Sequence, residues 1–190
     1  MTRKGGKEAR GIAKLGSAIA LMSAVLLSCL ALISPQASAA TYISGLIENP
    51  HWTAEDSPYV IVGDAILGPD DILIIDPGVE VRFGEGSSLY VEGRLSAGAS
   101  EGGSITFTSN LTTKQPGDWG SIILTGHGNV IKNAWIQYAH RGLLLLEHAS
   151  VSMEGVHLAD NLFAGIYSEN SSFEMKDTSI VENGEFGIYL

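Results

Sequence analysis

The chain of 190 residues contains a single cysteine, Cys29, which lies inside an apolar run near the amino terminus. The rest of the sequence therefore has no disulfide of its own, and its stability must come from apolar burial and backbone hydrogen bonds. Positive charge is also scarce, with 11 Lys and Arg against 21 Asp and Glu. This balance argues against partners such as nucleic acid or anionic lipid, which require clustered cations.

Helical periodicity is missing as well, since residues 41–190 contain no long stretch with apolar side chains at helical spacing. Short β-branched and aromatic runs alternate instead with turns rich in Gly, Pro and Asp, and these runs cover 59–62, 72–75, 79–83, 89–91 and 105–107. Within one run, Val79, Val81 and Phe83 alternate with charged residues, as in a strand with one buried face. The sequence therefore predicts an all-β protein.

The last third of the chain contains an internal repeat. Asn161-Leu-Phe-Ala-Gly165-Ile166-Tyr167 returns as Asn183-Gly-Glu-Phe-Gly187-Ile188-Tyr189, with Asn, Gly, Ile and Tyr each displaced by 22 positions. A repeat of this length indicates a short unit that buries its apolar face only by stacking on its neighbours. Because every unit runs in the same direction, equivalent strands must pair in parallel. We therefore expect a solenoid with turns of about 22 residues.

These motifs resemble right-handed parallel β-helix proteins of the pectin-lyase-like superfamily. The resemblance rests on the two repeat units and on Ile74-Ile-Asp-Pro77-Gly78-Val-Glu-Val81, Leu89-Tyr-Val-Glu-Gly93-Arg-Leu95, and Ile105-Thr-Phe-Thr-Ser109 followed by Gly117-Asp-Trp119. The second set is similar to the first turns of exported bacterial and archaeal β-helix surface proteins. The resemblance implies aliphatic stacks inside the helix and an asparagine ladder formed by Asn161 and Asn183.

A leucine-rich repeat is the alternative fold, because the segment 156–165 also fits its pattern of leucines followed by asparagine. That pattern needs more leucines in each unit, and the unit 178–190 has Thr178 and Glu185 at positions where apolar residues belong.

The amino terminus has the order of a secretory signal: a basic head, an uncharged apolar run over 15–33, and the small residues Ala37-Ser38-Ala39. We predict a signal peptide over 1–40, a cap segment over 41–58 and a parallel β-helix over 59–190. Removal of residues 1–40 takes away five basic residues and one acidic residue. The remaining chain has 6 Lys and Arg and 20 Asp and Glu, which gives a net charge of −14.

Two other interpretations of the same segment stay open. The apolar run is long enough for an uncleaved signal anchor that spans a bilayer. The sequence Leu26-Leu27-Ser28-Cys29 also resembles a lipoprotein processing box, although the apolar run continues beyond the cysteine. The predicted location is secreted or on the cell surface, with no membrane contact by the mature chain.

A Gly-His-Gly motif around His127 is the feature most similar to a catalytic element, since polygalacturonases of this superfamily combine such a motif with paired aspartates. Asp70 and Asp71 supply a pair, but the interval from Asp71 to Gly126 is more than two turns, whereas the family pattern requires a single turn. A lyase would instead use Arg141, Lys132 or His140 as its base. We assign no catalytic residue, and enzymatic activity stays open with a preference against it.

Sugar binding has three candidate residues, Trp119, Tyr167 and Tyr189, because flat aromatic rings stack on sugar rings. Trp135 could offer the same kind of surface. Asp160 and Glu182 are weak candidates for calcium, since carboxylates at the same position of neighbouring turns can share a cation. Residues of these types are more often solvent-exposed or packed, and no cofactor is expected.

These observations predict an exported β-helix scaffold that acts in adhesion or polysaccharide binding without catalysis. The alternative function is a polysaccharide lyase or glycoside hydrolase. The chain also ends at Leu190 in the middle of a predicted strand, so we expect a truncated helix. Its last turn would have an open edge and could associate with the edge of another copy.

Overall fold

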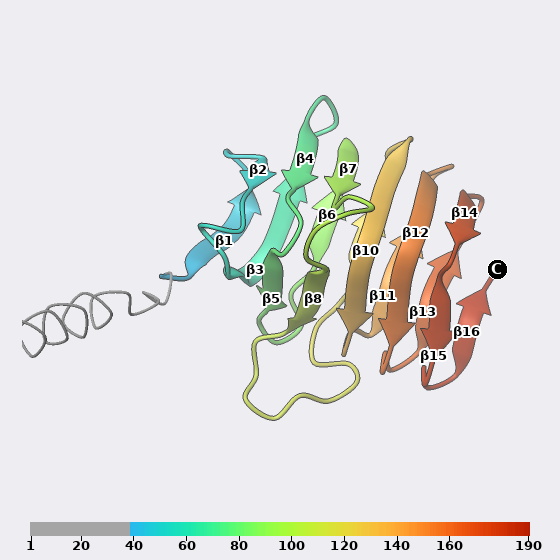
Figure 1. Cartoon of the computed structure of the whole chain (residues 1–190). Coiled ribbons are helices and arrows are strands. Elements are labelled where there is room, and N and C mark those ends of the chain that lie inside the picture. The colour runs from blue at the N-terminus through green and yellow to red at the C-terminus, as the bar shows by residue number, and fades with distance from the viewer. Residues whose placement is uncertain (1–38) are drawn as a thin grey trace, which may run out of the picture. The chain divides into compact units, whose positions relative to one another are not determined.

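The computed structural model describes residues 39–190, which form a parallel β-solenoid without a helix (Figure 1). The predicted signal peptide lies almost entirely outside these residues. Within the described part, no helix is long and apolar enough to cross a membrane. The predicted all-β class, with stacked turns of about 22 residues in parallel pairing, is confirmed.

The solenoid has about seven turns, and its strands form three parallel ladders, here called the first, second and third sheets. The first sheet contains β1 (Thr41–Leu46), β3 (Tyr59–Leu67), β5 (Glu80–Phe83), β8 (Ile105–Ser109), β10 (Asn129–Gln137), β12 (Ser150–Ala159) and β15 (Ser179–Val181). The second sheet contains the ends of β1 and β3 with β6 (Leu89–Val91), β9 (Ile122–Leu124), β11 (Arg141–Leu145), β13 (Ala164–Ser168) and β16 (Phe186–Tyr189). The third contains the beginnings of β10 and β12 with β2 (His51–Trp52), β4 (Ile72–Ile75), β7 (Arg94–Ala97) and β14 (Ser172–Lys176).

Alternation of apolar and polar residues explains which side chains enter the solenoid. In β4 and β5 every second residue is buried, and the residues between them face outward. The inward residues of successive turns stack in register, and one such column in the first sheet contains Tyr59, Val81, Phe107, Ile136, Leu158 and Ile180. Full burial of an aliphatic side chain contributes about 1.5–3 kcal/mol, so these columns are the main source of stability in a chain without disulfides.

Turn length varies in the middle of the solenoid. Val81, Phe107 and Ile136 are successive partners in the first sheet, and both intervals between them are longer than the regular turn. The interval from Ile136 to Leu158 has the regular length again. The extra residues lie in loops outside the stack, and the largest loop joins β8 to β9 (Figure 1). The insertions therefore conceal the repeat in the sequence without breaking the ladders.

Residues 41–58 form the first turn of the solenoid. Strand β1 pairs with β3, and β2 pairs with β4, so this segment covers the turn that begins at Tyr59. The leucine-rich alternative does not describe the repeat, because the strands of successive turns pair along three parallel ladders.

Candidate functional site

Asn161 and Asn183 lie at the same corner of neighbouring turns, between the first and second sheets. The Asn161 Nδ2 donates to Asn183 Oδ1 over 2.9 Å and to the Ile136 carbonyl over 3.3 Å, while Asn161 Oδ1 accepts from the Ala139 amide over 3.0 Å. Asn183 Nδ2 donates to the Leu158 carbonyl in turn. This asparagine pair fixes the corner from which the second sheet begins.

The outer surface of the second sheet has an apolar side chain at the same position of every turn. We call this row the apolar stripe, and its members are Leu46, Ile66, Tyr90, Ile123, Leu144, Tyr167 and Tyr189. In β3, β6 and β11 the residues on either side of the stripe residue are buried, so Ile66, Tyr90 and Leu144 point outward. With about 4.8 Å between turns, the stripe forms a straight apolar track along the solenoid.

The carboxyl-terminal end of the stripe widens into a cluster of aromatic rings. Tyr167 and Tyr189 stack with ring centroids 4.8 Å apart and an interplanar angle of 11°. Phe163 lies 6.0 Å from the Tyr189 centroid, and Phe186 lies 5.1 Å from it. We call the cluster of Phe163, Tyr167, Phe186 and Tyr189 with the cation of Arg141 the aromatic platform.

Arg141 places its guanidinium carbon 5.1 Å from the ring centroids of both Phe163 and Tyr167, within range of a cation–π interaction. Its Nη1 donates to Nδ1 of His140 over 3.1 Å. Burial and the Arg141 charge lower the pKa of His140. His140 therefore stays neutral near pH 7 and its Nδ1 is an acceptor, which holds Arg141 against the rings.

Three aromatic residues were predicted from the sequence to stack on sugar rings, and the structure places only two of them on the surface. Tyr189 is 39% exposed, and Tyr167 is half-buried beneath its stacked partner. Trp119 is 0% exposed, stacks on Phe83 at 3.9 Å and donates from Nε1 to the Gln137 carbonyl. The prediction for Trp119 is therefore corrected, because a ring enclosed in the core has no face to offer a sugar.

The calcium candidates Asp160 and Glu182 occupy equivalent corner positions, each with a φ angle of 54°. Both adopt the left-handed backbone conformation at this corner, as Tyr138 does one turn earlier with φ of 66°. Residues 39–190 contain no group of three or more His, Cys, Asp or Glu side chains arranged to hold a metal ion.

The Gly-His-Gly motif and the paired aspartates meet at the corner between the second and third sheets. A cavity of about 440 Å³ there, which we call the corner groove, is lined by Asp70, Asp71, Glu92, Arg94 and His127 together with neighbouring backbone. The Asp71 carbonyl accepts from the Arg94 amide over 3.0 Å, and a Cβ on Gly126 would lie 1.7 Å from the Gly93 carbonyl. These contacts place the motif only two turns from the aspartates.

A second cavity of about 520 Å³ adjoins the corner groove and shares Pro69, Glu92 and Thr125 with it. Two members of the apolar stripe, Tyr90 and Ile123, form part of its lining. The apolar stripe and the corner groove are thus continuous along one side of the solenoid.

Comparison of the chain with protein-family models, with curated proteins and with solved structures finds no match in any of the three. The function is therefore inferred from the geometry of this chain.

The stripe residues upstream of Tyr167 and the rings around Arg141 were not predicted from the sequence. The interval from Tyr90 to Ile123 is longer than the interval from Ile123 to Leu144, so no constant period connects these residues. A usable signal was present within β6, β9 and β11, since Tyr90, Ile123 and Leu144 are each the middle of an apolar triplet whose flanking residues are buried.

Proposed function

We propose that the protein is an exported β-helix scaffold that binds neutral polysaccharide outside the cell through the aromatic platform and the apolar stripe, without cleaving it. The observation on which this proposal depends is the stacked pair of Tyr167 and Tyr189, which project outward at equivalent positions of adjacent turns. Aromatic faces of this kind pack against the apolar faces of sugar rings. Arg141 adds hydrogen-bond donors beside them.

The charge of the chain favours neutral over acidic polysaccharides. Residues 41–190 have a net charge of −14, and the adjoining corner groove contains three carboxylates. A polyuronate would meet repulsion from this net charge and from the carboxylates of the groove, which outnumber its one cation, Arg94. The basic head, apolar run and small-residue site at the amino terminus support export.

The test is a co-sedimentation and affinity-electrophoresis panel with the chain from Ala40 onward. Galactomannan, xylan, mixed-linkage β-glucan, cellulose and chitin serve as neutral probes, and pectate and alginate serve as acidic probes. We expect retention by at least one neutral polysaccharide and none by pectate or alginate at low salt. Binding only to the acidic polymers, or to none of the panel, would refute the proposal.

A second candidate function, cleavage of a polysaccharide, is favoured by the corner groove alone. Asp70, Asp71 and His127 line one cavity that is open to solvent beside an apolar wall. Glycoside hydrolysis needs two carboxyl groups about 5–10 Å apart on opposite sides of the scissile bond. This activity fits the pectin-lyase-like superfamily that the sequence resembles.

Assays for new reducing ends and for unsaturated products, each run with and without calcium, separate the two functions. A scaffold without catalytic activity yields neither product from any polymer in the panel. Products that disappear in Asp71→Asn and persist in Asp64→Asn would establish the hydrolase instead, because Asp64 lies outside the lining of the corner groove.

A further inference from the structure

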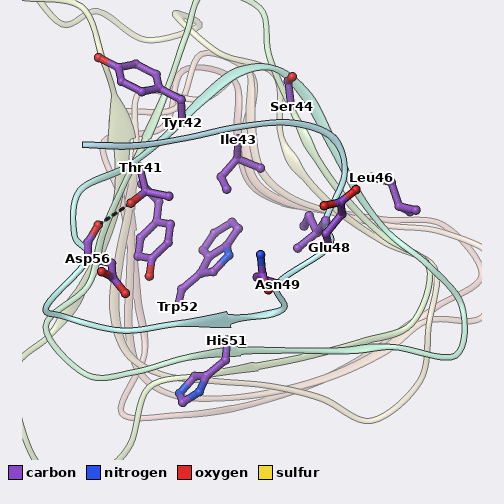
Figure 2. Close-up of a pocket in the computed structure, with 12 residues that line it drawn as sticks. Thr41, Tyr42, Ile43, Ser44, Leu46, Glu48, Asn49, His51, Trp52 and Asp56 are labelled. Carbon is purple, nitrogen blue, oxygen red and sulfur yellow. Dashed lines mark hydrogen bonds between the residues drawn. The ribbon is translucent and has the colours of Figure 1, made fainter. Parts of the chain in front are cut away.

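The first turn of the solenoid encloses a cavity of about 550 Å³, which we call the end pocket (Figure 2). Trp52 and Tyr59 form its aromatic wall, with ring centroids 4.9 Å apart and an interplanar angle of 14°. Its rim includes the polar side chains of Glu48, Asn49 and Asp56. The end pocket lies at the opposite end of the described solenoid from the aromatic platform.

The indole nitrogen of Trp52 is the unusual feature of this pocket. Trp52 is 1% exposed, and its Nε1 is buried without a hydrogen-bond partner in the protein. In the view of Figure 2, this nitrogen lies on the side of the ring toward Asn49. A buried N–H without an acceptor has lost its hydrogen bonds to water without replacing them, so native proteins rarely leave one unpaired.

The ring is not free to turn toward another acceptor. One of its neighbours is the stacked ring of Tyr59, whose hydroxyl accepts a hydrogen bond from the Thr53 amide over 2.9 Å. The Trp52 backbone is also fixed, because β2 pairs with β4 and the Trp52 carbonyl accepts from the Asp76 amide. The Nε1–H is therefore held in place, and an acceptor must come from the contents of the pocket.

The polar residues at the rim of the end pocket determine which other groups a bound ligand must carry. Glu48 and Asn49 make no side-chain hydrogen bond with any residue from 39 to 190, so both are available to a ligand. Asp56 accepts at Oδ2 from the Thr53 hydroxyl, which leaves its other oxygen available. His51 is engaged, with Nε2 at 3.0 Å from Asp76 Oδ1.

These groups exclude three classes of ligand. An anion would face the Glu48 and Asp56 carboxylates, and the lining of the pocket contains no Lys or Arg to offset them. An ammonium group has no lone pair for the Trp52 N–H, and an apolar group would leave it unpaired. A hydroxyl group fits both requirements, since it accepts from an N–H and donates to a carboxylate.

We propose that the end pocket binds a neutral sugar unit, with a ring hydroxyl that accepts from Trp52 Nε1 and neighbouring hydroxyls that donate to Glu48 or Asp56. The cavity is large enough for a monosaccharide or the last unit of a chain, since ligand pockets begin at about 300 Å³. This site is separate from the aromatic platform, and neither proposal depends on the other.

The test follows the Trp52 indole resonance by ¹H–¹⁵N NMR while galactose, mannose, glucose or N-acetylglucosamine is added. The chain has three tryptophans, and the variants Trp52→Phe and Trp135→Phe assign their indole signals. We expect a saturable shift of the Trp52 signal with at least one sugar. The Trp119 signal stays in place, because its N–H already binds the Gln137 carbonyl.

Two variants test the roles of the donor and the acceptor. Trp52→Phe keeps an aromatic ring against Tyr59 and removes the N–H, so sugar affinity measured by calorimetry should fall by roughly five- to tenfold. Glu48→Gln should weaken binding by a similar factor, while Trp135→Phe, outside the pocket, should leave it unchanged. Backbone amide spectra confirm that each variant is folded.

Several results would overturn the proposal. The first is the absence of any shift of the Trp52 indole signal with all of the sugars. The second is an indole proton that contacts only a bound water molecule, which would show that an internal water is the acceptor. A shift with glucuronate, glucosamine or N-acetylglycinamide in place of the neutral sugars would assign the pocket to another ligand class. A shift of the ligand-free signal in Asn49→Ala, without any response to sugar, would identify Asn49 as the partner. Loss of polysaccharide binding at the aromatic platform would leave these results unaffected.

Discussion

Asn161 donates from its Nδ2 to the Oδ1 of Asn183, one turn further along the solenoid, over 2.9 Å. The same Asn183 oxygen also accepts from the Asn161 backbone amide over 3.2 Å. Asn161 is fully buried, and its side chain satisfies backbone groups of the preceding turn as well. An asparagine at this corner therefore connects three successive turns, which no apolar residue of equal size can do.

Replacement of Asn161 by alanine should destabilise the solenoid by about 2–4 kcal/mol, because the buried Ala139 amide and Ile136 carbonyl lose their partners. Urea unfolding followed by circular dichroism measures the change. Asn110→Ala is the matched control, since Asn110 is exposed and its side chain makes no hydrogen bond within residues 39–190. Equal effects of the two variants would show that the ladder does not contribute to stability.

The substitution Glu182→Gly should stabilise the protein by about 0.5 kcal/mol. Glu182 has a left-handed backbone conformation, which glycine adopts without the strain that a side chain causes. The comparison is Glu174→Gly in strand β14, where added backbone freedom should destabilise by about 0.5–1 kcal/mol. Thermal unfolding gives both values. Destabilisation of the same size in the two variants would contradict the strain assigned to the corner.

The ion pairs of Glu154 should make stability depend on pH in the acidic range. Hydrogen bonds from Lys176 and Lys132 lower the pKa of Glu154 from 4.5 to about 2. A carboxyl group with a lowered pKa in the folded state stabilises it above the unfolded pKa. That contribution disappears as the pH falls from about 4.5 to about 2.

The measurement is the unfolding midpoint of the wild type and Glu154→Gln between pH 6 and pH 2. We expect the difference between the two proteins to shrink as the pH falls through this window. High salt should reduce the difference at pH 6, because the pairs lie at the surface. A constant difference across the whole range would exclude the ion pairs as its cause.

The substitution Gly126→Ala should destabilise the protein by about 1–3 kcal/mol, because the added methyl group has no space at this position. The added Cβ would lie 1.7 Å from the carbonyl oxygen of Gly93, which belongs to the backbone of the neighbouring turn. Gly63→Ala is the control, since its nearest neighbour would be 3.9 Å away. Chemical denaturation of both variants provides the test, and a tolerated Gly126→Ala would mean that the turns at the corner groove are less closely stacked.

The fold was predictable because each level of the sequence agreed with it: alternation within the strands, glycine and aspartate at the turns, and the return of Asn161 as Asn183. The candidate site was predictable only where the period is constant, which is how Tyr167 and Tyr189 were found. Tyr90 and Ile123 belong to the same stripe, but inserted loops make the interval between them longer than the regular turn. The same insertions lengthen the interval from Asp71 to Gly126, which the structure spans in two turns, still one more than the superfamily pattern requires. Burial of Trp119 depends on long-range packing that no local pattern reveals.

The central claim is that the outward tyrosines of the second sheet bind polysaccharide, and a paired comparison of surface aromatic residues tests it most directly. Affinity electrophoresis in gels containing the neutral polysaccharide retained in the binding panel would compare Tyr167→Ala/Tyr189→Ala with Trp135→Ala. Trp135 is a suitable match because it is 39% exposed, as Tyr189 is. Its ring lies on the first sheet, away from the apolar stripe, and stacks on His157 with ring centroids 4.3 Å apart. We predict that the double variant loses at least tenfold in affinity while Trp135→Ala binds like the wild type. Unchanged binding by the double variant, or a larger loss in Trp135→Ala, would contradict this claim.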